Sequence, residues 1–191
     1  MLKLKEYGLK EAYIRKLMKE FGAYSDMFIA SNFNLFSDKF KSTLEKVDKV
    51  DVSRILETHN KSSVRIISAK DNEYPSDIKK LVDFPTFLYV KGNEMHRERK
   101  IAVVGTRKVT KFGKASCEKI VKDLLEYDIT IASGLAEGID TIALNIAVQK
   151  NNNPIAIVGT GLDIVYPFEN REIWEKIGRE GTIISEYPLG T

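Results

Sequence analysis

The amino-acid sequence predicts an α/β fold: a mostly parallel sheet with helices on both faces, preceded by a small all-α domain. Residues 1–62 carry apolar side chains at helical spacing, with no strand pattern between them. From residue 63 onward, short apolar runs alternate with helical stretches, which is typical of a doubly wound sheet. We therefore expect a helical domain over residues 1–62 and an α/β domain over residues 63–191.

Composition restricts the class of protein. The chain has 191 residues, of which 43% are hydrophobic and 30% are charged, as expected for a globular protein. No apolar run approaches the ~20 residues that span a bilayer, and the N-terminus has no signal-peptide stretch, so we expect a cytoplasmic protein without membrane contact. The only cysteine, Cys117, excludes an internal disulfide, and two histidines, His59 and His96, leave no zinc ligand set. We expect neither a metal nor a cofactor.

The N-terminal segment predicts short helices. Ile14, Leu17, Met18 and Phe21 recur on one helical face, and Gly22 is a plausible stop. Further helical stretches cover residues 26–33 and 44–60, and residues 59–63 have the composition of a linker. Such a bundle could hold a nucleic-acid backbone or a protein, or could serve as a packing or dimerisation module without a ligand.

The pattern of residues 63–191 predicts the strands and helices of the sheet domain. Strands are expected at residues 64–68, 86–92, 101–104, 129–133, 154–158 and 181–185. Helices are expected at residues 75–82, 114–127, 141–149 and 171–180. The run at 101–104 consists of apolar residues only, which favours a strand buried on both faces.

The turns that follow three of these strands predict a ligand crevice. In an open parallel sheet, ligands bind outside the carboxyl ends of the strands, so residues 105–107, 133–138 and 159–161 should converge there. A strand, the glycine turn at Gly105 and a helix N-terminus form an anion site, to which Arg107 adds a guanidinium group. A purely structural turn is the alternative.

Local charge favours the anion site. Between residues 97 and 114 the only acid is Glu98, although the whole chain has 30 basic and 27 acidic residues. The basic residues in this stretch are Arg97, Arg99, Lys100, Arg107, Lys108, Lys111 and Lys114. This concentration indicates a polyanionic partner.

Other chemistry fits the turns less well. A dinucleotide site requires three glycines in the order G-x-G-x-x-G, but no glycine follows Gly105 until Gly113. Ser133 as a nucleophile would need a nearby base, and His96 precedes the 101–104 strand, at the opposite end of the sheet. Asp140 and Asp163 are read as helix or turn caps rather than as catalysts.

Several motifs resemble one family. The sequence reads VGTRKVTKFG at 104–113, SGLAEGID at 133–140, GTGLDIVYPFEN at 159–170 and ISEYPLGT at 184–191, after YPSDIKKLVDFPTFLYVKGN at 74–93. These motifs closely resemble the bacterial DNA-processing protein A (DprA/Smf) family, and residues 1–62 are similar to its small SAM or helix-hairpin-like domain. The resemblance implies a Rossmann-like domain that binds single-stranded DNA without an enzymatic reaction and passes it to the RecA recombinase during transformation and recombination.

The resemblance also implies a set of binding residues. The anion pocket of the family maps onto Gly105, Thr106 and Arg107, with Ser133, Gly134 and Gly138 beside them. Together with the basic and loop residues, the expected DNA- and phosphate-binding set is Gly105, Thr106, Arg107, Lys108, Lys111, Phe112, Ser133, Gly134, Gly138, Gly159, Thr160, Gly161, Asn170 and Arg171.

Aromatic residues near the loops could stack on bases. The candidates are Phe112, Tyr166, Phe168 and Tyr187, although turn packing is favoured for Tyr166 and Tyr187, which precede prolines. Trp174 is expected in the core.

Two features depart from the family pattern. Leu144 stands where the family usually has histidine, and the sequence ends at Thr191 without the basic segment that follows in the family. We therefore expect a domain incomplete at its carboxyl end, whose 181–185 strand is an exposed edge. A homodimer is among the partner expectations.

The rival function is that of a nucleotide-binding or nucleotide-hydrolysing enzyme of the phosphoribohydrolase type, although its PGGxGTxxE loop is not matched by GTGLDI.

Overall fold

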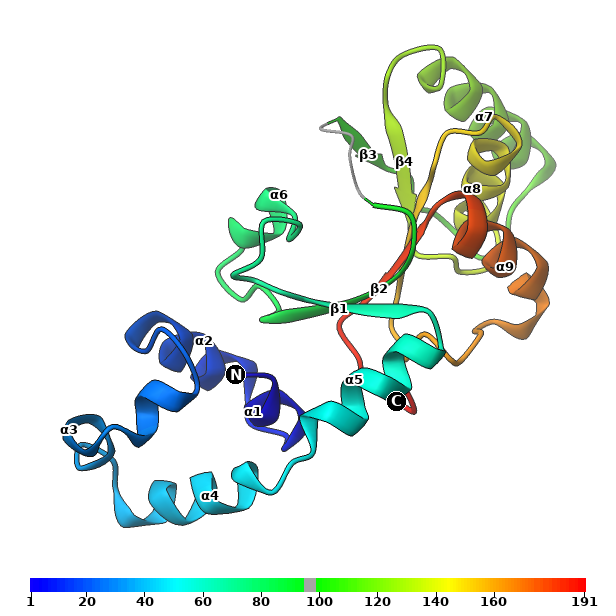
Figure 1. The fold of residues 1–191 in the computed structure, drawn as a ribbon. Helices are drawn as coiled ribbons and strands as arrows, with labels where there is room; N and C mark the ends of the chain where they lie inside the picture. The colour runs from blue at the N-terminus through cyan, green and yellow to red at the C-terminus, as the bar shows by residue number, and fades with distance from the viewer. Residues whose placement is uncertain (95–98) are drawn as a thin grey trace.

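The structure, a computed structural model, describes residues 1–94 and 99–191 (Figure 1). His96, Arg97 and Glu98 lie outside the described residues. The helices are α1 (Leu2–Glu6), α2 (Glu11–Glu20), α3 (Ala30–Phe33), α4 (Asp38–Asp48), α5 (Val52–Lys61), α6 (Ser76–Lys79), α7 (Lys111–Leu124), α8 (Ile139–Gln149) and α9 (Arg171–Glu180), with 3₁₀ turns η1 (Ser25–Phe28) and η2 (Phe168–Asn170). The strands are β1 (Val64–Ser68), β2 (Phe87–Gly92), β3 (Lys100–Ala102), β4 (Thr130–Ser133), β5 (Ile155–Val158) and β6 (Thr182–Ser185).

The strands of the described residues form one six-stranded sheet in the order β1-β2-β6-β5-β4-β3. The four strands from β6 to β3 are parallel, whereas β1 pairs with β2 and β2 pairs with β6 in antiparallel fashion. The predicted α/β class with a mostly parallel sheet is confirmed. The prediction that the 181–185 strand is an edge is wrong, because β6 lies between β2 and β5.

The two faces of the sheet are covered unequally. Helices α5, α7, α8 and α9 pack on one face, and the main core there includes Tyr89, Leu144 and Trp174. The other face is covered by α6 and the segment around it, which pack over Ile67, Leu88 and Ile184.

The edge strand β3 differs from its prediction. Ala102 is exposed, and Val104, just beyond the strand, is 73% exposed. The expectation that residues 101–104 are buried on both faces is therefore wrong. An apolar run specifies a strand, but its position in the sheet order decides how much of the strand is covered. No helix in the described part of the chain combines the length and apolar character needed to cross a membrane.

The N-terminal helices have a separate core. Its buried members are Leu4, Ile14, Leu17, Phe21, Met27, Leu44 and Val47. Helices α4 and α5 are capped by Ser37 and Asp51, which accept hydrogen bonds from backbone N–H groups of the first turns. The prediction of a linker at residues 59–63 is wrong: α5 continues to Lys61, and His59 is buried with its ring stacked on Tyr89, at 5.2 Å between centroids.

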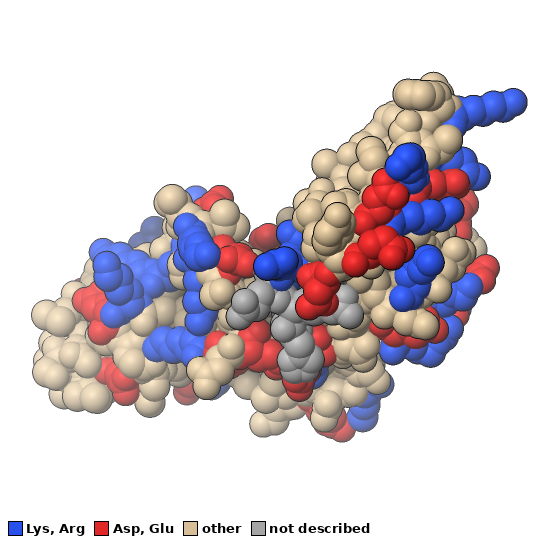
Figure 2. Space-filling model, turned by 90° about the horizontal axis from the view of Figure 1, so that it is seen from above, with Lys and Arg blue, Asp and Glu red and all other residues tan. Residues whose placement is uncertain are grey.

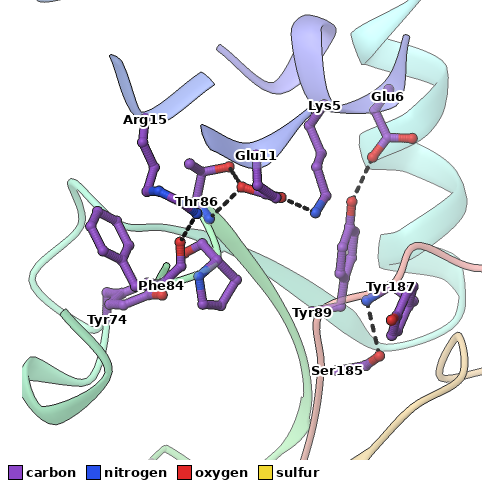
Figure 3. A network of polar contacts seen from close by, with 11 residues as sticks. Lys5, Glu6, Glu11, Arg15, Tyr74, Phe84, Thr86, Tyr89, Ser185 and Tyr187 are labelled. Carbon is purple, nitrogen blue, oxygen red and sulfur yellow. Dashed lines mark hydrogen bonds and ion pairs between the residues drawn. The ribbon is translucent and has the colours of Figure 1, made fainter. Parts of the chain in front are cut away.

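A polar network joins the N-terminal helices to the sheet (Figure 3). The Glu11 carboxylate accepts hydrogen bonds from the backbone N–H and the hydroxyl group of Thr86, at 3.0 and 2.7 Å, and pairs with Lys5. Arg15 donates to the carbonyl oxygen of Phe84 at 2.8 Å, and the Tyr89 hydroxyl donates to Glu6 at 2.6 Å. These contacts connect α1 and α2 to the segment that enters β2 and to β2 itself.

The environment of Glu11 alters its acidity. Burial raises the pKa of the Glu11 carboxyl group, but hydrogen bonds from Lys5 and Thr86 outweigh burial, so the net pKa lies below the ordinary value of 4.5. A carboxyl group whose pKa falls on folding stabilises the native state above its unfolded pKa. That stabilisation is lost as the pH falls through the folded pKa.

We predict that Glu11→Ala lowers the free energy of unfolding at pH 7 by about 1–3 kcal/mol, because Lys5 and the Thr86 amide lose their acceptor. Urea denaturation measures the change. Glu57→Ala is the matched control, since Glu57 is an exposed partner of Lys61 on α5 and such pairs contribute little.

The difference between wild type and Glu11→Ala should shrink as the pH falls below about 4.5, because the unfolded carboxyl group then binds a proton, and it should be lost once the pH falls through the lower pKa of the folded state. Equal unfolding free energies at pH 7 for the wild type and the Glu11→Ala variant would show that this network does not stabilise the folded chain.

Candidate functional site

A cavity of about 350 Å³ lies at the carboxyl ends of the parallel strands. We call it the crevice pocket, and its lining is Arg107, Gly134, Ala136, Glu137, Val158, Gly159, Thr160, Tyr166 and Pro167. These residues come from the loops after β3 and β4 and from the end of β5 with its following loop. The predicted convergence of three loops at one rim of the sheet is therefore present in the structure.

The crevice pocket contains only part of the predicted binding set. Arg107, Gly134, Gly159 and Thr160 line it, as does the exposed aromatic ring of Tyr166. Sequence reasoning missed the exposed carboxylate of Glu137 as a lining group. Its position in SGLAEG, between two glycines of a turn already assigned to the crevice, was the signal that could have found it.

A close backbone approach positions Arg107. The N–H of Ile139, at the start of α8, donates to the carbonyl oxygen of Thr106 at 3.2 Å. Gly138 has φ of +85°, and a β-carbon built on it would lie 2.3 Å from that same oxygen. Only glycine permits this approach without strain, so Gly138 allows the turn that carries Arg107 to rest on α8.

The arrangement differs from a glycine turn that runs directly into a helix. Helix α7 begins at Lys111, six residues beyond Gly105, and the hydroxyl group of Thr110 caps it by accepting from the Gly113 N–H at 3.0 Å. Thr110 thus satisfies one of the backbone N–H groups at the start of α7 that the sequence assigns to an anion. Thr106 instead closes the local turn, because its hydroxyl oxygen accepts from the Lys108 N–H at 3.1 Å.

The Arg107 side chain remains available to a ligand. It is exposed, and none of the described carboxylates lies within ion-pair distance of it. A guanidinium group can bind a phosphate through two parallel hydrogen bonds. Arg107 and Glu137 are the charged groups of the lining, so the crevice pocket has one cation and one anion.

Groups with catalytic potential near the crevice pocket are engaged in the fold. Ser133 is buried, and its hydroxyl group donates to the Val103 carbonyl oxygen at 2.6 Å. Asp140 is buried and accepts from the Gly134 N–H at 3.1 Å. Asp163 accepts from the Gly190 N–H at 3.0 Å. These contacts fit the reading of both aspartates as structural caps.

Asn170 stabilises the turn after β4, which lines the crevice pocket. It is buried, and its side-chain amide donates to the Leu135 carbonyl oxygen and to the Thr141 hydroxyl group, both at 2.8 Å. Leu135 has φ of +56° and is fully buried, so the turn after β4 needs such support. The contacts of Asn170 position the pocket wall.

The other members of the predicted set are dispersed. Lys108 and Lys111 are exposed, and Phe112, in the first turn of α7, is 82% exposed. Gly161 is buried, where its N–H donates to the Thr191 carbonyl oxygen at 2.8 Å. Arg171 lines a different cavity, which is described below. Gly105 packs against Ile139.

One departure from the family pattern has a structural account. Leu144 is fully buried in the main core beneath the sheet, where it packs with the residues around Trp174. An apolar side chain at this position therefore contributes to packing.

Lysine and arginine side chains gather over the N-terminal helices in the view from above, and basic and acidic side chains alternate at the opposite end of the molecule (Figure 2). The surface seen there is mixed in sign.

The mostly parallel sheet and the loops that meet at the carboxyl ends of its parallel strands define an α/β protein with a candidate ligand site at that rim. Comparison with known proteins then gives the family. Residues 65–191 match the family model described as DNA recombination-mediator protein A, and the chain belongs to that family.

Individual relatives agree with this assignment. Protein Smf of Synechocystis sp. is 38% identical over 143 residues, covering 72% of this chain and 36% of that protein. DNA processing protein DprA of Streptococcus pneumoniae is 33% identical over 198 residues, covering 98% of this chain and 67% of that protein. The chain thus spans about a third of one relative and two thirds of the other.

Solved structures agree with the fold. The X-ray structure of DprA from Streptococcus pneumoniae has a TM-score of 0.81 at 32% identity and covers 99% of this chain and 67% of that chain. DNA processing protein A from Helicobacter pylori, whose single-stranded DNA binding mode has been described structurally, has a TM-score of 0.57 at 29% identity. That alignment covers 66% of this chain and 57% of the Helicobacter protein.

We predict that Gly138→Ala lowers the free energy of unfolding by about 1–3 kcal/mol, because the added β-carbon strains a positive φ and meets the Thr106 carbonyl oxygen. Thermal or urea unfolding measures the loss. Gly159→Ala is the control: it lines the same pocket, and a β-carbon there meets no atom within 4 Å. If both variants are as stable as wild type, the close approach at Gly138 has no energetic consequence.

Proposed function

We propose that this chain binds single-stranded DNA in the crevice pocket without a chemical reaction and without a cofactor, as a recombination mediator. The observation that carries the proposal is the guanidinium group of Arg107, which forms no ion pair with the described residues, beside the exposed ring of Tyr166 in one cavity. Single-strand binding proteins combine cations that hold the backbone with aromatic rings on which bases stack. Family membership and the described binding mode of the Helicobacter protein support the same function.

The acid in the lining is compatible with this proposal if the strand enters in one orientation. A phosphate would lie on the Arg107 side of the crevice pocket, where the guanidinium group attracts it. Glu137 would then face the base, whose N–H groups can donate to a carboxylate. Lys108, Lys111 and Lys114 add sequence-independent attraction nearby.

We predict that Arg107→Ala weakens binding of a single-stranded oligonucleotide by about ten- to hundredfold, because hydrogen bonds between charged groups contribute about 1.5–3 kcal/mol. A fluorescence-anisotropy titration measures the change. The matched control is Arg54→Ala, which removes an exposed arginine of α5 outside the crevice pocket.

A salt series provides a second readout for the wild type. If about five phosphates are neutralised, affinity should fall about a hundredfold between 50 and 200 mM salt. Binding as tight in Arg107→Ala as in the wild type, or an affinity that does not depend on salt, would refute the assignment of the crevice pocket to DNA.

One observation favours a second function. A carboxylate and an arginine in a cavity of about 350 Å³ could also serve an enzyme that binds and hydrolyses a nucleotide. The carboxylate of Glu137 follows β4, however, whereas the phosphoribohydrolase motif places a glutamate in the loop that contains Gly161. This chain has Asp163 in that loop, where it accepts from the Gly190 N–H.

The variant Glu137→Gln separates the two functions. Removing the negative charge should leave binding of single-stranded DNA intact, because the side-chain carbonyl oxygen of glutamine still accepts a hydrogen bond from a base N–H group. Mononucleotides incubated with wild type and variant, and analysed for released base, test the alternative. Base release by the wild type that is lost in Glu137→Gln would favour the enzyme.

The wider role is part of the same proposal. We infer delivery of the bound strand to a RecA-type recombinase in the cytoplasm, because the family is described by recombination mediation. A homodimer remains a proposal, which sedimentation analysis of the purified chain would test.

A further inference from the structure

A second cavity of about 460 Å³ lies next to the crevice pocket. We call it the second hollow, and its lining is Ser62, Lys91, Leu162, Asp163, Val165, Phe168, Arg171, Trp174 and Glu175. It is formed by the end of α5, by β2, by the loop after β5 and by the first turns of α9. One member of the predicted binding set, Arg171, and one stacking candidate, Phe168, are brought together here rather than in the crevice pocket.

Two cation–aromatic pairs line the second hollow. The Lys91 ammonium nitrogen lies 4.9 Å from the centroid of the Trp174 ring, and the Arg171 guanidinium carbon lies 5.8 Å from that of Phe168. Phe168 is 68% exposed, so most of its ring is open to a stacking partner. Trp174 is only 8% exposed and forms part of the wall. Rings and cations in one groove are the features that bind single strands.

The acids of the second hollow already have partners. Glu175 accepts from the Arg171 Nε atom at 3.0 Å, and Asp163 accepts from the Gly190 N–H at 3.0 Å. Lys91 donates to the Ser62 carbonyl oxygen at 3.3 Å, and none of the described carboxylates pairs with it. Among the described residues, Lys91 and Asp163 are thus the charged groups of the lining without an oppositely charged partner, and the Lys91 ammonium group can contact a phosphate.

The two cavities share one wall. Within the segment 165–168, Tyr166 and Pro167 line the crevice pocket, while Val165 and Phe168 line the second hollow. Two exposed rings, Tyr166 and Phe168, therefore lie two residues apart on a chain that separates the cavities.

We propose that the second hollow is a second nucleotide subsite for the same strand: a base stacks on Phe168, and Lys91 and Arg171 contact the adjoining phosphates. This inference rests on the proposed function and extends it, since it defines the path of the strand across the 165–168 segment. Binding at both cavities makes affinity depend on oligonucleotide length.

The test compares two single-stranded oligonucleotides, one of about 4 and one of about 12 nucleotides. The wild type should bind the longer oligonucleotide more tightly than the shorter one, because only the longer one fills both cavities. Phe168→Leu should weaken binding of the longer oligonucleotide about tenfold and leave the shorter one unchanged, because leucine is apolar but offers no aromatic plane. Tyr127→Leu, which removes another exposed ring, is the control.

Two arginine variants of α9 test whether a positive charge in the second hollow contributes to binding. Arg171→Gln should weaken binding of the longer oligonucleotide, whereas Arg179→Gln, an exposed arginine of α9 outside the second hollow, should not. Trp174, the single tryptophan of the chain, gives a native reporter in the wall of the second hollow. Its fluorescence should change with the longer oligonucleotide and not with the shorter one.

The possible outcomes distinguish the two proposals. Binding of neither oligonucleotide by the wild type would overturn both. Normal Arg107-dependent binding of both lengths, with Phe168→Leu and Arg171→Gln equal to wild type on the longer one, would overturn the second subsite and leave the crevice pocket intact. Loss confined to the longer oligonucleotide, with the Trp174 signal, supports it.

Discussion

The contact between the backbone of Thr106 and Gly138 is the constraint on which the crevice depends. It joins the loop after the edge strand β3 to the start of α8, and it leaves no space for a side chain at residue 138. Because β3 is only three residues long and lies at the edge of the sheet, the strand alone would give the following loop little support. The hydrogen bond from α8 fixes that loop and thereby aims Arg107 into the pocket.

The loop after β5 organises the rest of the rim. It begins at the end of the pocket-lining strand and ends at the buried Asn170, which holds the turn after β4 through the Leu135 carbonyl oxygen. Between these two points the segment 165–168 lies between the two cavities, with Tyr166 and Pro167 lining the crevice pocket and Val165 and Phe168 lining the second hollow. A loop anchored at both ends can present aromatic rings at low entropic cost, because its backbone is already ordered before a ligand arrives.

Much of the architecture could be predicted from residue pattern. The alternation of apolar runs with helical stretches gave the α/β class, and glycine or serine after three strands gave the convergence of loops that forms the crevice. Arg107, Gly134, Gly159 and Thr160 were found this way. Asn170 shows the limit of the method: a polar residue in a loop suggests a ligand contact, whereas its burial makes it a support for the pocket wall.

The sequence by itself determined the strands, most helices, the glycine turns and the separate apolar face of the N-terminal helices, because each depends on periodicity or on the conformational freedom of neighbouring residues. Only the tertiary structure decided that β6 is internal and β3 is the edge, that His59 packs on Tyr89, and that Arg107 and Arg171 face different cavities. Strand order and side-chain surroundings arise from contacts between residues far apart in the chain, and local sequence patterns do not predict such contacts.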